Sequence, residues 1–124
     1  MTKKNRTSKT PAQKPRMPDE TMELVATQFR ALAEVSRLRL LERLIEGPEN
    51  VTELAEYAGL SHANASKHLN LLASAGLVVR RKQGSTVMYE VADSVPERLC
   101  KVVCDRVAAR LARDLASAKR FLER

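Results

Sequence analysis

The chain has 124 residues, which suits one domain, and hydrophobic residues make up 44% of it, enough for a compact core. Aromatic residues are only 3% and tryptophan is absent, so we expect an aliphatic core and more helix than strand. No stretch approaches the ~18 apolar residues of a transmembrane helix, and the basic N-terminus lacks the apolar core of a secretory signal. With two cysteines and no export signal, the sequence predicts a protein of the reducing cytoplasm.

Charge is distributed unevenly along the chain, whose net charge is +7. Residues 1–18 hold six basic side chains and no acidic one, and their composition predicts a disordered basic tail. Residues 19–124 carry 16 basic and 15 acidic side chains and are predicted to form the one domain. No Asp or Glu occurs between Tyr57 and Tyr89, which indicates a polyanionic partner, although on charge alone a solvated basic face is the simpler interpretation.

Two helices are predicted after the tail. Apolar residues recur at three- and four-residue spacing over residues 20–33, which predicts an amphipathic helix. The chain then breaks at residues 34–36, where Ser36 can cap a second helix, and Gly47-Pro48 ends that helix. The apolar positions of the first helix are Met22, Val25, Phe29 and Leu32, and those of the second are Leu38, Leu41, Leu44 and Ile45.

Two short helices flank a glycine turn in the middle of the chain. Asn50 followed by Glu53 resembles a capping box that opens a third helix, which ends at Gly59. Ser61 can cap a fourth helix, which ends at Gly76. Two helices around such a turn form a helix-turn-helix, whose second helix can enter the major groove of DNA. The predicted inner face of the fourth helix is Ala65, Leu69, Leu72 and Ala75.

The residues from 77 to 91 change to the two-residue period of strands. β-Branched residues flank the segment 83–86, which predicts a hairpin with one half-buried face. Ser94 and Glu97 then form a capping box that opens a long helix to about Leu122. Its apolar residues are Val95, Leu99, Val103, Val107, Leu111 and Leu115. The predicted fold is mostly α with a small β-hairpin, a winged helix-turn-helix.

Six short motifs follow one another between residues 24 and 93. They are Arg37 to Leu41, Leu54-Ala55, Leu60-Ser61, Ser66 to Leu69, Leu72 to Val78, and Gly84 to Tyr89. As a set they resemble the ArsR/SmtB family of bacterial transcriptional repressors, in which a long last helix is also expected. The chain departs from that pattern at residues 34–36, where the family often has Asp-Pro-Thr/Ser, and at residues 63–65, where Ser-Thr-Val is common. The first departure alters a loop, and the second can shift the preference for DNA sequence.

The exposed side of the fourth helix and the hairpin supply candidate DNA contacts. An Asn side chain can bond adenine through two hydrogen bonds, and Lys can reach guanine or a phosphate. An ordinary polar helix face is the competing interpretation, and the position between the turn and a basic hairpin favours binding. The predicted contacts are Ser61, His62, Asn64, Ser66, Lys67, Arg80, Arg81, Lys82 and Gln83. His68, beside Leu69, is predicted instead to be a packed core histidine.

The resemblance implies a homodimer formed through the first and last helices. Such a dimer places the two copies of the fourth helix, the recognition helix, about 34 Å apart, the distance between successive major grooves. The apolar stripe of the last helix is too long for one small domain to cover, which agrees with dimerisation through that helix. Some members of the family bind metal through Cys-x-Cys on the third helix, but those positions are Asn50 and Thr52 here. Others bind zinc through Asp and His pairs on the last helix, but both histidines of this chain lie on the fourth helix. Neither known metal site is therefore present.

Cys100 and Cys104 lie four residues apart on the last helix. That spacing puts the Cβ atoms about 6 Å apart on one face, too far for an unstrained disulfide. Two thiolates so placed can chelate As(III), Cd(II) or Zn(II) if a partner chain or small thiol completes the shell. Cysteine also packs as a small hydrophobe, and both residues flank the apolar stripe. The sequence leaves the sensory and the structural role open.

These features together predict a sequence-specific DNA-binding regulator, a cytoplasmic homodimeric repressor released by an effector. The candidate effector is a thiophilic metal or metalloid ion, or an oxidant, at Cys100 and Cys104. Two alternatives stay open: an effector-independent regulator with structural cysteines, and a winged-helix module for protein–protein interaction. An enzyme is not expected, because the chain has no Cys/His pair placed for nucleophilic catalysis and no glycine loop for phosphate. The expected partners are operator DNA and a second copy of the chain, with no membrane and no required cofactor.

Overall fold

The computed structural model describes residues 14–123, so most of the predicted basic tail, residues 1–13, lies outside the described residues. Residues 14–18 are exposed and have no regular secondary structure. The elements that follow are α1 (Asp19–Leu32), α2 (Val35–Leu44), β1 (Glu49–Asn50), α3 (Val51–Ala58), α4 (His62–Ser74), β2 (Val78–Gln83), β3 (Thr86–Val91) and α5 (Val95–Leu122). Among the helices of this described range, none is long and apolar enough to span a bilayer.

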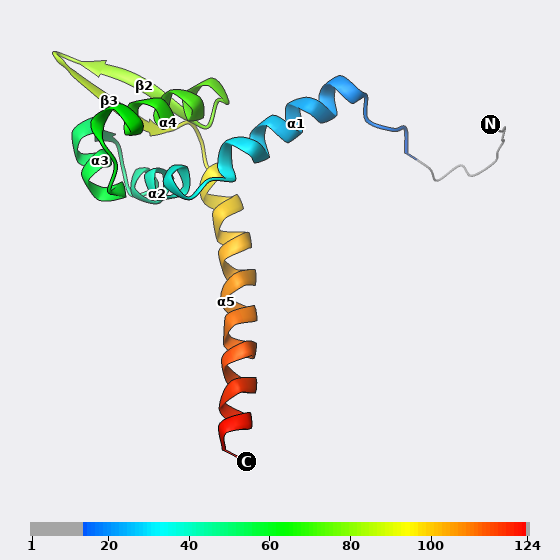
Figure 1. The fold of residues 1–124 in the computed structure, drawn as a ribbon. Helices are drawn as coiled ribbons and strands as arrows, with labels where there is room; N and C mark the ends of the chain where they lie inside the picture. The colour runs from blue at the N-terminus through cyan, green and yellow to red at the C-terminus, as the bar shows by residue number, and fades with distance from the viewer. Residues whose placement is uncertain (1–13, 124) are drawn as a thin grey trace.

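A compact unit of α2, α3, α4 and the sheet holds the core (Figure 1). The end of α1 adds Ala31 to this core, whose other buried members are Leu40, Leu41, Leu44, Leu54, Leu69, Leu72, Leu77, Val78 and Tyr89. All but Tyr89 are aliphatic, as the composition predicts. The inner face predicted for α4 is confirmed, with Ala65, Leu69 and Leu72 buried and Ala75 half-buried.

One position of the α2 face was predicted wrongly. Leu38 is 41% exposed, whereas Leu40, which was not assigned to the face, is fully buried. The reason is that α2 contacts both α3 and α4, so its buried stripe is centred between Leu40 and Leu44 and turns Leu38 outward. Leu41 and Leu44 are buried as predicted.

Four helix starts test the capping predictions. Asn50 Oδ1 accepts from the backbone N–H of Glu53 at 2.9 Å, and Ser61 Oγ accepts from that of Asn64 at 3.1 Å, so both caps are confirmed. The reciprocal bond of a capping box is not formed, because the N–H of Asn50 donates to Glu49 Oε1 at 3.1 Å. The prediction for α2 was wrong, because Glu34, in extended conformation, accepts from the N–H of Arg37 at 3.0 Å in place of Ser36. The prediction for α5 was also wrong: Ser94 has helical backbone angles and makes no side-chain capping bond.

The hairpin is confirmed and belongs to a larger sheet. β2 and β3 pair antiparallel from Val78↔Val91 to Gln83↔Thr86, and Gly84, in the turn, has φ +64°. The unexpected element is β1, which pairs antiparallel with the other edge of β3 and gives the order β1-β3-β2. β1 ends at Asn50, the residue that caps α3, so the sheet is joined directly to the helix-turn-helix.

α1 and α5 extend out of the compact unit in different directions, and the hairpin projects on the side away from α1 (Figure 1). Phe29 of α1 is 58% exposed, and on α5 every residue from 101 to 122 is exposed. The apolar stripe predicted for α5 therefore lies at the surface of the single chain, with Leu115 72% exposed.

Candidate nucleic-acid interface

The turn between α3 and α4 has the geometry that a helix-turn-helix requires. Gly59 ends α3 with φ +69°, a left-handed conformation that glycine adopts without steric cost. The N–H of Leu60 donates to the carbonyl of Ala55 at 2.9 Å, which closes the end of α3. Ser61 then opens α4. The second helix thus leaves the turn with its first residues, from His62 onward, facing solvent.

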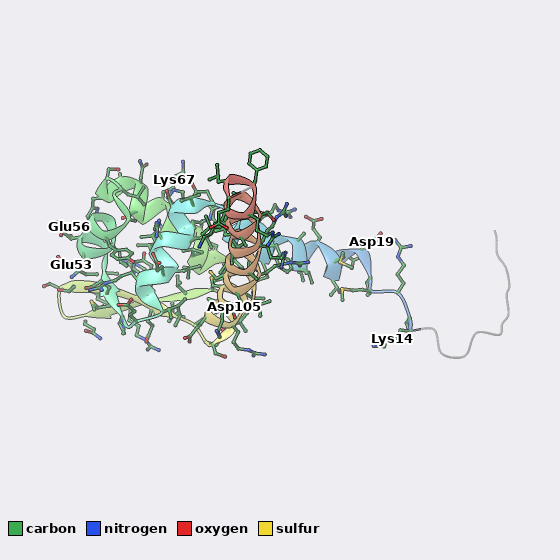
Figure 2. All side chains as sticks on the ribbon, turned by 90° about the horizontal axis from the view of Figure 1, so that it is seen from below. Lys14, Asp19, Glu53, Glu56, Lys67 and Asp105 are labelled. Carbon is green, nitrogen blue, oxygen red and sulfur yellow. The ribbon has the colours of Figure 1, made fainter. Side chains whose placement is uncertain are left out.

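The predicted contacts on α4 lie on its outer side. His62, Asn64 and Lys67 are exposed and Ser66 is half-buried, and Figure 2 shows Lys67 at the outside of the molecule. Ser61 is exposed too, but its Oγ already accepts from the backbone of Asn64, so its first role is to cap the helix. The helix offers donors and acceptors of the kinds that base edges and phosphates bond.

The strand register divides the four predicted hairpin residues between two faces. Arg80 pairs with Tyr89 and Lys82 with Val87, so these two basic side chains lie on the face of the sheet that carries buried Tyr89. Arg81 and Gln83 lie on the opposite face, where the Arg81 guanidinium is bonded to the carboxylate of Glu90. The structure therefore brings Arg80 to the groove beside α4, leaves Lys82 further out on the same sheet face, and sets Arg81 apart with its charge paired.

A groove of about 620 Å³ separates the start of α3, the outer side of α4 and the hairpin. Its lining residues are Asn50, Val51, Thr52, Glu53, His62, Ser66, Asn70, Arg80, Ser85, Thr86, Val87 and Tyr89. It brings together three of the predicted contacts, His62, Ser66 and Arg80. Apart from Glu53 and Arg80, the polar lining groups are uncharged or histidine, and several carry O–H or N–H donors that suit phosphate oxygens.

Besides Asn50, Glu53 and Tyr89, to which the sequence assigned only structural positions, the sequence reasoning missed four polar residues of this groove: Thr52, Asn70, Ser85 and Thr86. Asn70 is held in place from the sheet, because the Tyr89 hydroxyl donates to its Oδ1 at 3.2 Å. The Asn70 amide N–H groups then remain to donate elsewhere. Small hydroxyl residues carry little signal in a sequence, and only the folded sheet brings Ser85 and Thr86 opposite Thr52.

The acidic residues that precede the acid-free stretch are largely paired with arginines of α2. Arg43 lies 3.4 Å from both Glu46 and Glu49, and Arg39 donates to Glu42 at 2.9 Å. The bond from Arg39, and then the bond from Tyr57, hold the pKa of Glu42 below its ordinary value. Glu53 and Glu56 point outward from α3 (Figure 2). Negative charge therefore borders the groove on the α3 side.

His68 lies on the inner flank of α4, as predicted, but it is half-buried and has a polar partner. Its Nδ1 is 3.2 Å from Nη1 of Arg37 on α2. It does not line the groove. The prediction that His68 packs inside and does not contact DNA directly is consistent with this placement.

Cys100 is half-buried and Cys104 exposed, both as free thiols on α5. Burial, and then the neighbouring Cys104 thiol, raise the pKa of Cys100 above its ordinary value. A raised pKa reduces the fraction of thiolate, which is the form that binds metals and reacts with oxidants. Among residues 14–123 no group of three or more His, Cys, Asp or Glu side chains is placed to hold a metal ion.

Comparisons with known proteins point to one family. The profile of bacterial regulatory proteins of the arsR family matches residues 34–79. The probable mercury resistance operon repressor of Streptomyces lividans is 40% identical over 76 residues, which are 61% of this chain and 58% of the repressor. The chain thus spans little more than half of that relative. The HTH-type transcriptional regulator KmtR of Mycobacterium tuberculosis is 35% identical over 91 residues, 73% of this chain and 68% of KmtR.

A solved structure has the same fold. A homodimeric winged helix-turn-helix DNA-binding domain from Mycobacterium bovis, described as a possible ArsR-family transcriptional regulator, superposes with a TM-score of 0.71. The two chains are 30% identical, and the match covers 78% of this chain and 93% of that domain. The mostly helical winged helix-turn-helix predicted from the sequence is confirmed by this likeness and by the structure.

Proposed function

This chain belongs to the arsR family of bacterial regulatory proteins, and from that premise we propose that it is a homodimeric transcriptional repressor that binds operator DNA. The observation that carries the proposal is the groove between α3, α4 and the hairpin, where His62, Ser66 and Arg80 converge. All three relatives compared above are described as regulators of transcription or as the DNA-binding domain of one, and none is described as an enzyme. Such a repressor acts in the cytoplasm, where bacterial DNA lies.

In the proposed complex α4 enters the major groove and the hairpin follows the flanking backbone. Asn64 and Lys67 project from the outer side of α4, where base edges come within reach of a bound helix. Arg80 and the small hydroxyl residues line one groove, and we expect them to bond one stretch of phosphates. Arg81 contributes less, because Glu90 already neutralises its charge.

Dimerisation follows from the exposed apolar faces of α1 and α5. Val103, Val107 and Leu111 form a continuous stripe on α5, each at least 49% exposed in the single chain. Exposed apolar stripes of this length are unfavourable in water and are typical of helix–helix interfaces. The Mycobacterium bovis domain is homodimeric, and a dimer of this chain through α1 and α5 presents two α4 helices to one duplex.

Two versions of the repressor differ in the role of the cysteines. In the first, a thiophilic metal ion, metalloid or oxidant reaches Cys100 and Cys104 and releases the DNA; the mercury resistance relative and the four-residue spacing favour it. In the second, the cysteines only pack near the dimer interface; the raised pKa of Cys100 favours it. Changing both cysteines to Ser separates them, because release by Cd(II) or As(III) is abolished in the first version.

The test measures the affinity for two DNA duplexes across a series of salt concentrations. One duplex is taken from upstream of the chain's own gene, and the other has a random sequence. We expect tighter binding to the upstream duplex. Arg80→Ala is expected to lower the slope of log affinity against log salt by about 0.9 for each phosphate that is no longer neutralised, so by about 1.8 for a dimer. Arg81→Ala, on the adjacent residue, is the matched control and is expected to change the slope less.

Two results would contradict the proposal. Equal binding of both duplexes across the salt series would favour the alternative, a winged-helix module for protein–protein interaction. Equal effects of the Arg80 and Arg81 substitutions would contradict the assignment of the groove face as the phosphate-binding face.

A further inference from the structure

The Arg37 side chain joins three helices. Its Nε donates to the carbonyl of Ala31 at 2.6 Å and its Nη2 to that of Arg30 at 3.2 Å, both at the end of α1. Its Nη1 lies 3.2 Å from Nδ1 of His68 on α4. Arg37 itself belongs to α2, so one guanidinium contacts the last turn of α1 and the middle of the proposed DNA-reading helix.

Within residues 14–123 this guanidinium bonds two backbone carbonyls and an imidazole, and no carboxylate. Glu34, the nearest acidic residue in the sequence, accepts instead from the backbone N–H of Arg37. Two of the three partners are the last carbonyls of a helix, whose partial negative charge attracts a cation. The third is an imidazole nitrogen, which can accept from a guanidinium only when it carries no proton. A hydrogen bond from the guanidinium to Nδ1 therefore requires the tautomer of His68 that carries its proton on Nε2.

A second contact ties the same two helices further along. Gln28 Nε2 of α1 donates to the carbonyl of Ala75, just past the end of α4, at 2.7 Å. α1 is thus connected to α4 at two places: through Arg37 at the middle of α4, and through Gln28 at the end of α4. Two separated contacts restrain the angle between helices as well as their distance.

We propose that Arg37 is a positioning residue that holds α4 at a fixed angle to α1, so that the two reading helices of a dimer match two major grooves at once. This inference rests on the proposed function, since α1 carries an exposed apolar face assigned there to the dimer interface. A specific site needs both α4 helices in register with the duplex, whereas random duplex is held mainly through phosphates. Removing the bond between Arg37 and His68 therefore lowers specific binding more than nonspecific binding.

The substitutions are Arg37→Met, His68→Leu and the double change, with Arg39→Met as the matched control. Arg39 lies on the same helix, but it is exposed and bonded to Glu42. The specific probe is a duplex selected by the unchanged protein from a random library. We expect each single change to weaken binding to it by roughly tenfold, and the double change to weaken it little further, because either change alone breaks the bridge from α1 through Arg37 to His68. Binding to random duplex and the Arg39→Met protein are expected to stay within about twofold.

A conservative change provides the rescue test. In His68→Gln the side-chain carbonyl can still accept from the Arg37 guanidinium, so specific binding is expected to exceed that of His68→Leu. A role in packing alone predicts the reverse, because Leu fills a half-buried position better than Gln. Additive losses in the double change, or equal losses on specific and random duplex, would overturn the proposal.

The bond between Arg37 and His68 can also be measured without DNA. Nitrogen-15 NMR at about pH 8, above the ordinary titration range of imidazole, reports the tautomer of each ring, and the chain has only two histidines. We expect the Nε2–H tautomer for His68 in the unchanged protein and its disappearance in Arg37→Met, with exposed His62 unchanged as the internal reference. A proton on His68 Nδ1 in the unchanged protein would overturn the proposed bond. If library selection returns no sequence, the proposed function fails while this spectrum still tests the bond.

Discussion

The compact unit and the two outer helices use similar apolar residues in opposite ways. Leu40, Leu69 and Leu72 are fully buried within the chain, whereas Leu111 and Leu115 of α5 are 63% and 72% exposed. Both sets recur at helical spacing, so periodicity alone does not distinguish them. The difference shows that the compact unit buries its core within one chain, while most of the large apolar residues of α1 and α5 stay exposed among residues 14–123.

The largest expected effect is on the compact unit. Leu69→Ala removes a fully buried side chain at the junction of α4 with the core and is expected to lower the free energy of unfolding by about 2–5 kcal/mol. Leu115→Ala is the matched control on α5. Denaturant unfolding, at a protein concentration low enough to keep the chain monomeric, measures both. A loss from Leu115→Ala as large as that from Leu69→Ala would contradict the division into two regions.

The next effect is on association. Leu111→Glu places a carboxylate in the α5 stripe and is expected to weaken dimerisation by at least about 2 kcal/mol, or roughly 30-fold. Helical content by circular dichroism is expected to persist, because the compact unit is untouched. Sedimentation measures the association, and Arg113→Glu on the same helix is the control. A Leu111→Glu protein that still dimerises as tightly would place the interface elsewhere.

Two serines that look alike in the sequence are expected to differ. Ser61→Ala removes the cap of α4 and is expected to cost about 1 kcal/mol of stability. Ser94→Ala at the start of α5 removes no capping bond and is expected to change stability by only a few tenths of a kcal/mol. Thermal unfolding of the two proteins decides the point. Equal losses would mean that α5 is capped through Ser94 after all.

The smallest effect lies at the joint between α1 and α2. The backbone N–H of Arg37 holds the pKa of Glu34 below its ordinary value of 4.5. The charged form is therefore favoured in the folded chain, and its stabilisation is present above that ordinary value and lost as the pH falls through the lowered pKa. Glu34→Gln keeps a capping oxygen without the charge, so it is expected to be slightly less stable at neutral pH and equal below the lowered pKa. Thermal unfolding across a pH series measures the difference in stability between the two proteins. A difference that grows as the pH falls would contradict the lowered pKa of Glu34.

Much of this fold could be predicted because its signals are local. The helix-turn-helix is marked by Asn50, Gly59 and Ser61, each within a few residues of the backbone group that it serves. β1 could not be predicted, because its two residues pair with Tyr89 and Met88, far along the chain. Glu34 was missed as a cap because serine is the commoner residue there.

The candidate site was predicted less completely than the fold. The exposed side of α4 follows from helical period, so His62, Asn64 and Lys67 were found. The hairpin residues were treated as one basic set, and only the strand register separates Arg80 from Arg81. Arg37 could not be recognised as a partner of His68, because the bond joins residues 31 positions apart and depends on how α2 packs against α4.

The short segment between α2 and α3 has a consequence for how this chain can vary. Asn50 pairs with Met88 in the sheet and also caps α3, while Glu49 pairs with Tyr89 and bonds Arg43. Adding one residue between Glu49 and Asn50 would turn one of the two to the other face of the strand and break its bonds. Unlike most surface connections, this one therefore has a fixed length, and natural insertions are expected in the hairpin turn at Gly84 and Ser85 instead.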